Sequence, residues 1–186
     1  MNSTKRFSIK KLTLMAVLLA VSLIIFVIEA QIPLPVPIPG VKLGLSNTVT
    51  LFALFFNQNN NTGNSDYSFR NVRLTKLDVF FILICRIILG ALFTGRVIAL
   101  IYSFTGGMIA FLVLIILKRY VTNNQIWVCG AVCAVFHNIG QISAAIIIIG
   151  SPVIAVYLPV LIIAGIITGV ITGLIAQFTV LRIIEI

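Results

Sequence analysis

The sequence predicts an all-α, polytopic membrane protein with six transmembrane helices in one bundle and both termini in the cytoplasm. Three observations lead to this prediction. Of the 186 residues, 60% are hydrophobic and 9% are charged, whereas soluble domains are about 25% charged. Several apolar runs approach the roughly 20 residues that a helix needs to cross a hydrocarbon core of roughly 30 Å. Hydrophobicity along these runs does not alternate with a period of two, which argues against a β-barrel.

The first predicted span covers residues 12–28 and follows a basic start, residues 1–11, that contains Lys5, Arg6, Lys10 and Lys11. A basic start of this kind is typical of a signal peptide. Because Glu29 leads into a proline-rich segment instead of a small-residue cleavage site, we interpret the span as an uncleaved signal anchor. The basic start is then expected in the cytoplasm.

The second predicted span is irregular. Residues 31–40 are rich in alternating prolines, and proline locks an extended backbone and removes amide donors, so this stretch cannot be helical. The apolar run 41–56 that follows contains Lys42, Gly44, Ser46 and Asn47. Its uninterrupted part is short enough for a re-entrant segment. Residues 57–76 form a polar, asparagine-rich loop, which we expect in the cytoplasm.

Four further spans are predicted over residues 77–94, 97–117, 126–150 and 153–181. If the second segment crosses the membrane, ten of the thirteen Lys and Arg residues fall on the cytoplasmic side, Lys42 and Arg96 fall outside, and Arg86 lies within a span. If it turned back, the three basic residues of the 57–76 loop would move outside. The positive-inside rule therefore favours six spans. We predict a single transmembrane domain over residues 1–186.

Composition also excludes several classes of function. The net charge of +9 does not indicate nucleic-acid binding, because the basic residues lie between apolar runs and form no basic folded domain. The chain has four carboxylates, and no two are close enough in sequence to suggest a Mg²⁺ site for diphosphate chemistry. No GxxxxGK[ST], HExxH or GxSxG motif is present. We therefore predict that the chain is not an enzyme and has no cofactor. Asp78 is interpreted as the N-cap of the third span.

Polar side chains at membrane depth are the candidate functional residues, because a central arginine costs roughly 2.5–3.5 kcal/mol on insertion scales and needs a partner or a purpose. Arg86 lies midway along the 77–94 span. It either forms a structural ion pair with Glu29 or binds an anionic group in a substrate cavity. The two interpretations are compatible.

A second polar group, His137, Asn138 and Gln141, lies in the middle of the 126–150 span. His137 and Gln141 are four residues apart and share a helix face, while Asn138 is offset. These side chains either form interhelical hydrogen bonds or line a substrate site. Cys129 and Cys133 continue the stripe of His137. Ligands one turn apart on a single helix rarely close a metal coordination shell, so we predict no metal site.

Small residues indicate close helix contacts, and an interrupted segment indicates a pocket. Gly165, Gly169 and Gly173 form a GxxxGxxxG face that predicts close helix contact, within the bundle or with a partner. Broken segments at membrane depth often line binding sites, because non-helical backbone survives there where protein or a watery cavity satisfies it. The proline-rich connection is either an ordinary extracellular loop or a loop over an outward-facing pocket. We favour the pocket, with Glu29 and Lys42 at its rim.

Several motifs carry a resemblance to a known family along nearly the whole chain: EAQIPLP at 29–35, IPGVKLGLSN at 38–47, RIILG at 86–90, SFTGG at 103–107, HNIGQ at 137–141 and YLPVL at 157–161. The sequence resembles the bacterial family called Gx transporters, which is also labelled heptaprenyl diphosphate synthase component I. It departs from that pattern in the loop over residues 57–70, which looks longer than usual.

That family is similar to the substrate-binding S components of energy-coupling factor (ECF) transporters. Those six-helix membrane proteins capture a vitamin or similar small molecule outside the cell and dock onto a coupling subunit with two ATPases. The resemblance implies a substrate-binding subunit in the cell membrane, with Ala16 and Ala20 on an AxxxA docking face and the proline loop as a gate. The expected substrate-binding residues are Glu29, Lys42, Asn47, Arg86, His137, Asn138 and Gln141.

The alternative function is a non-catalytic membrane accessory of isoprenoid, heptaprenyl diphosphate or quinone synthesis. The enzyme label of the family motivates it. A chain without paired aspartates would lack the metal site of a prenyl synthase, so the chain would at most assist a separate synthase.

Overall fold

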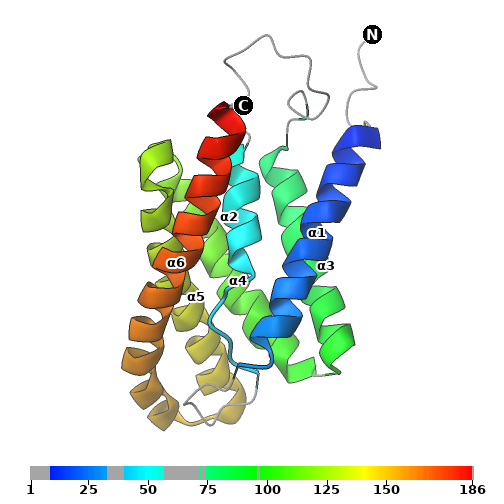
Figure 1. Cartoon of the computed structure of the whole chain (residues 1–186). Coiled ribbons are helices and arrows are strands. Elements are labelled where there is room, and N and C mark those ends of the chain that lie inside the picture. The colour runs from blue at the N-terminus through cyan, green and yellow to red at the C-terminus, as the bar shows by residue number, and fades with distance from the viewer. Residues whose placement is uncertain (1–8, 33–39, 57–71, 73, 96, 186) are drawn as a thin grey trace.

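The computed structural model describes residues 9–32, 40–56, 72, 74–95 and 97–185; for residues 184 and 185 it describes the backbone alone. These residues form helices and connections and contain no strand, which confirms the predicted all-α membrane bundle (Figure 1). The α-helices are α1 (Ile9–Glu29), α2 (Asn47–Phe56), α3 (Lys76–Thr94), α4 (Val97–Leu117), α5 (Ile126–Ile149) and α6 (Leu158–Glu185). Two 3₁₀-helices, η1 (Asn123–Gln125) and η2 (Pro152–Tyr157), precede α5 and α6.

Five helical segments in the described part of the chain are long and apolar enough to cross a membrane: Ile9–Glu29, Lys76–Thr94, Val97–Leu117, Asn123–Ile149 and Pro152–Ile183. The remaining α-helix, α2, has only 10 residues. It rises about 15 Å, which is about half of the hydrocarbon thickness. The second predicted span is therefore a half-helix preceded by non-helical backbone over residues 40–46.

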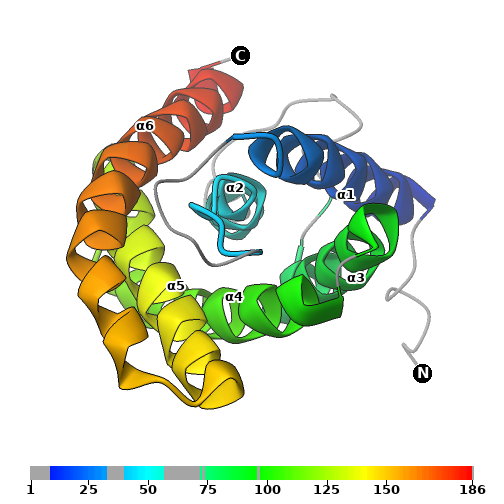
Figure 2. The same cartoon turned by 90° about the horizontal axis from the view of Figure 1, so that it is seen from below.

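The short helix α2 lies at the centre of the bundle. Figure 2 shows α1, α3, α4, α5 and α6 arranged around it in that order, and α2 contacts all five. Seven of its ten residues are buried. Because neighbouring helices surround this segment, the non-helical backbone that leads into α2 is shielded from lipid, as membrane proteins require.

The last predicted span, residues 153–181, differs from the structure at its start. The chain forms the 3₁₀-helix η2 over Pro152–Tyr157, and α6 begins at Leu158. Pro159 has no amide hydrogen and cannot donate to the carbonyl group one turn earlier, so an α-helix cannot continue smoothly through this point. The boundaries predicted for the other long spans agree with α1, α3, α4 and α5 to within three residues.

The start of α3 carries a capping box, and it corrects the interpretation of Asp78. The N-cap is Thr75, whose hydroxyl accepts a hydrogen bond from Asp78 N at 3.3 Å, while Thr75 N donates to Asp78 Oδ2 at 2.5 Å. Asp78 also pairs with Lys11 of α1 at 2.6 Å. Two backbone groups at the helix end are thus satisfied reciprocally, and α1 is tied to the start of α3.

Glycines allow α5 and α6 to pack closely. A Cβ atom added at Gly169 would lie 2.6 Å from the Gly130 carbonyl oxygen, and one added at Gly173 would lie 2.6 Å from Trp127 Cα. The predicted contact face of α6 therefore meets α5 inside the bundle. Close backbone approach of this kind is what small residues permit in membrane helices.

Both ends of α2 are held by charged side chains, one from α1 and one from the turn that follows α4. At the start, the Glu29 carboxylate accepts hydrogen bonds from the backbone N–H groups of Gly44, Leu45 (3.1 Å) and Ser46 (3.4 Å). At the end, Lys118 Nζ donates to the Leu54 carbonyl oxygen. An anion at the N-terminus and a cation at the C-terminus both complement the helix dipole. The position of α2 is thereby fixed along its axis.

We expect Gly169→Ala to lower the stability of the bundle by about 1–3 kcal/mol, because the added methyl group overpacks the α5–α6 contact. Thermal unfolding of the detergent-solubilised protein measures the effect. Thr179→Ala, at an exposed position of the same helix, is the matched control and should stay near wild type. Equal midpoints for Gly169→Ala and wild type would contradict this packing.

We expect Glu29→Ala to leave the N–H groups of residues 44–46 without their acceptor and to cost about 2–3 kcal/mol. Sodium formate should restore part of the lost thermal stability, since its carboxylate can occupy the vacated place. Formamide and an equal concentration of sodium chloride are the controls. The assignment fails if formate stabilises the variant no more than it stabilises wild type.

Candidate functional site

Polar side chains from four parts of the chain converge at the start of α2, in the interior of the bundle. We call this group the central polar cluster. It consists of Glu29 from α1, Lys42, Ser46 and Asn47 from the segment before α2 and its first residue, Arg86 from α3, and His137 and Gln141 from α5. All of these except Asn47 are buried, and Asn47 is half-buried. Buried polar groups are costly unless they bond to one another, so the contacts within the cluster decide what it can do.

Arg86 connects α3 to the start of α2. Its side chain is 2% exposed. Its Nη1 donates to Ser46 Oγ at 2.6 Å, and its Nη2 donates to Asn47 Oδ1 at 2.9 Å. Within the described residues, Arg86 and Glu29 form no direct ion pair, because the Glu29 carboxylate is taken by the backbone N–H groups of residues 44–46. Ser46 bonds to both and links the two charged groups.

His137 and Gln141 connect α5 to the same segment. Asn47 Nδ2 lies 3.1 Å from His137 Nδ1, and Gln141 Nε2 lies 2.7 Å from His137 Nε2. The Gln141 carbonyl oxygen accepts from the backbone N–H of Lys42 at 3.0 Å. The helical spacing of His137 and Gln141 places both on the face that meets α2, as the sequence pattern indicates.

Lys42 and Gly44 show how closely this segment fits its surroundings. The Lys42 ammonium group lies over the Phe26 ring, 3.1 Å from its centroid, where a cation–π attraction stabilises a charge removed from water. Gly44 has φ +83°, and a Cβ atom there would lie 2.9 Å from His137 Cδ2. A larger residue would be strained in its backbone and would displace the imidazole.

Asn138 lies outside the cluster. Its Nδ2 donates to the Leu161 carbonyl oxygen of α6 at 2.6 Å. This is an interhelical hydrogen bond of the kind that connects membrane helices. A role for Asn138 in substrate binding stays a prediction.

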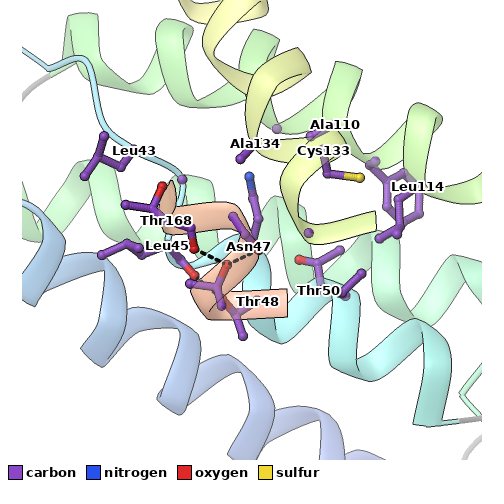
Figure 3. A pocket seen from close by; sticks show the side chains of 17 residues that line it. Leu43, Leu45, Asn47, Thr48, Thr50, Ala110, Leu114, Cys133, Ala134 and Thr168 are labelled. Carbon is purple, nitrogen blue, oxygen red and sulfur yellow. Dashed lines mark hydrogen bonds between the residues drawn. The ribbon is translucent and has the colours of Figure 1, made fainter. Parts of the chain in front are cut away.

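A pocket lies next to the cluster, between α2, α4, α5 and α6 (Figure 3). About 450 Å³ of space in it is free of protein atoms, open solvent included. Leu43, Leu45, Ala110 and Leu114 supply apolar wall, and Thr48, Thr50 and Thr168 supply hydroxyl groups. Asn47 belongs to both the pocket and the cluster. The sequence marks Ser46 only as an interruption of the apolar run and does not single out Thr50, because one hydroxyl in an apolar run is a weak signal of a site.

Several expected features are not placed. The described residues do not include residues 1–8, the proline segment over residues 33–39, the loop over residues 57–71 or Arg96. Ala16 and Ala20 are described, and both are exposed on α1. Among the described residues, no three His, Cys, Asp or Glu side chains are grouped so that they could hold a metal ion.

The chain matches a known protein family along most of its length. No curated protein and no solved structure matches the chain. A family model described as "Heptaprenyl diphosphate synthase component I" matches residues 18–63 and 68–179, which is most of the chain and all of the central polar cluster. The resemblance to that family label is thus confirmed. The chain is a multi-pass membrane protein that belongs to the heptaprenyl diphosphate synthase component I family.

Proposed function

We propose that the chain is the substrate-binding membrane subunit of an uptake transporter, similar to the S components of ECF transporters, and that it binds a small molecule. The observation that carries the proposal is the convergence of buried polar side chains on the start of a half-helix at the centre of the bundle. Such half-helices form substrate sites in membrane transporters, because their N-termini present a positive dipole end inside the protein. Six of the seven expected binding residues belong to this cluster or border it; Asn138 is the exception.

The proposed orientation places both chain ends in the cytoplasm of a bacterial cell. The start of α1 and the end of α6 lie at the same end of the bundle (Figure 1), and the charge distribution favours the cytoplasm for that end. The start of α2 then faces the outer half of the cell membrane. A solute arriving from outside would meet Glu29 and Lys42 first.

The proposed partner is a coupling subunit with ATPases, which would dock on α1. Ala16 and Ala20 are exposed on one face of α1 and leave the backbone accessible between larger apolar side chains. Small residues let a second helix approach closely in a membrane. This surface is therefore suited to a helix of another membrane protein.

The proposed role is non-catalytic, and the chain acts as a single domain without a cofactor. Two carboxylates with described side chains have structural contacts: Glu29 bonds to the backbone before α2, and Asp78 belongs to the capping box of α3. Neither is placed to bind Mg²⁺ with the other. The reaction of a prenyl synthase would thus need another chain.

We expect Ala16→Trp to reduce co-purification of a coupling subunit by about tenfold or more, which corresponds to about 1.4 kcal/mol. Position 16 is exposed, so the bulky ring should block docking without disturbing the bundle. Ile171→Trp, at an exposed position of α6, is the control and should keep the complex. An unchanged complex in Ala16→Trp would count against the docking face.

A second candidate function is a membrane accessory of prenyl diphosphate or quinone synthesis. The description of the matching family, a component of heptaprenyl diphosphate synthase, favours it. In this case the chain would bind a soluble synthase and hold it at the membrane, where a long apolar product is released.

For this second function we expect a soluble prenyl synthase to co-purify with the tagged chain, and we expect product length or yield to change when the chain is removed. Product analysis of membranes with and without the chain measures the effect. A tagged, unrelated six-span protein controls for nonspecific capture. If no synthase associates and products are unchanged, the accessory role is excluded.

A further inference from the structure

The central polar cluster contains more positive than negative formal charge. Glu29, Lys42 and Arg86 are the charged side chains of the cluster, and they are 4%, 7% and 2% exposed. Two cations and one anion leave one positive charge in excess. The N-terminus of α2 adds a partial positive charge at the same place. A net charge removed from water is costly, so this site favours an additional anion.

The Glu29 carboxylate is not available to neutralise Arg86 directly. Its oxygens accept from the N–H groups of residues 44–46. The Arg86 guanidinium instead donates to two neutral oxygens, Ser46 Oγ and Asn47 Oδ1. Its Nε is buried and has no hydrogen-bond partner among the described residues. Arginine commonly binds carboxylates with two of its N–H groups, and here that capacity is only partly used.

The hydrogen bonds around His137 also contain a surplus donor. Arg86 donates to the carbonyl oxygen of Asn47, so the NH₂ group of Asn47 faces His137 Nδ1. The backbone N–H of Lys42 donates to the side-chain carbonyl oxygen of Gln141, so the NH₂ group of Gln141 faces His137 Nε2. A neutral imidazole accepts at one nitrogen and donates at the other. One amide N–H is therefore in excess and would be satisfied by an acceptor atom of a ligand.

The guanidinium group of Arg86 lies beside Gly107, a residue of the pocket wall, although Arg86 does not line the pocket itself. Gly107 lines the pocket, and a Cβ atom added there would lie 3.8 Å from Arg86 Nη2. Beyond this point the wall is formed largely by leucine and alanine side chains and by threonine hydroxyl groups. A ligand with a charged end near Arg86 and Asn47 would thus place its remaining atoms among mostly apolar groups.

We propose that the ligand of this site is a small organic monoanion, a carboxylate with a compact apolar body. The carboxylate takes the N–H groups of Arg86 and Asn47, and the body occupies the pocket between α2, α4, α5 and α6. One negative charge neutralises the excess, whereas a diphosphate would reverse it in a site without a grouped set of metal ligands among the described residues. The inference rests on the proposed substrate-binding function and names its substrate class.

The test uses 3-methylbutanoate as the probe and 3-methylbutanamide as its neutral, nearly isosteric control, at equal ionic strength, with the full chain in mild detergent. We expect the carboxylate to raise the thermal unfolding midpoint by about 3 °C once its concentration exceeds its Kd about tenfold. The amide should not raise it. Equal shifts with both compounds, or no shift with the carboxylate, would overturn the inference.

Variants of the protein test whether the probe binds at Arg86. Arg86→Gln should lose the shift and Arg86→Lys should keep part of it, while Ser143→Ala, at an exposed position of α5, should respond as wild type does. If Arg86→Gln does not fold, two comparisons still test whether the carboxylate binds at Arg86: Arg86→Lys against wild type, and the carboxylate against the amide. A full shift in Arg86→Gln would overturn the assignment to this site.

Mass spectrometry of small molecules retained by the gently purified protein separates this inference from the proposed function. A retained organic monoanion supports both. A retained neutral or cationic molecule, with the coupling complex intact, overturns the monoanion and leaves the binding function standing. A retained prenyl diphosphate overturns the monoanion and favours the accessory role. If no molecule is retained and no coupling complex forms, both proposals fail.

Discussion

The bond between the Glu29 carboxylate and the backbone N–H groups of residues 44–46 is the contact on which the rest of the site depends. It joins the end of α1 to the start of α2 and satisfies three backbone donors of the non-helical segment just before the helix. With this segment held, Ser46 and Asn47 face Arg86. Without an acceptor at this point, several buried backbone groups would lack partners, and α2 would lose one of the two contacts that fix its depth in the bundle.

Because α2 lies at the centre of the bundle, the non-helical backbone before it is surrounded by protein and can form a polar site. A half-helix in contact with lipid would expose unsatisfied backbone groups, whereas here α1, α3, α4, α5 and α6 surround it (Figure 2). Lys118 holds the other end of α2 through the Leu54 carbonyl oxygen. The helix is therefore fixed at both ends by charges of the sign that its dipole favours. The close glycine contacts between α5 and α6 complete the wall of the pocket beside it.

The arrangement of charges supports the binding role that we propose. The Glu29 carboxylate is engaged by backbone donors. The polar side chains that line the otherwise apolar pocket are Asn47, four threonines and Cys133. A preorganised set of donors recognises an acceptor at little cost in reorganisation, which suits capture of a solute. The family description leaves room for a second role, in which the same bundle would serve as a membrane anchor for a synthase.

The sequence by itself determined the class of fold, the positions of the long spans and the identity of the polar residues at depth, because hydropathy and residue type are local properties. It also indicated that residues 41–56 would be irregular, since Gly44, Ser46 and Asn47 interrupt an apolar run. Tertiary structure decided which polar groups meet. Arg86 bonds to Ser46 and Asn47, about forty residues earlier in the chain, and not to Glu29. Asn138 bonds to α6 and not to the cluster. Bonds between residues so far apart depend on the depth and rotation of each helix in the bundle, and no local pattern contains that information.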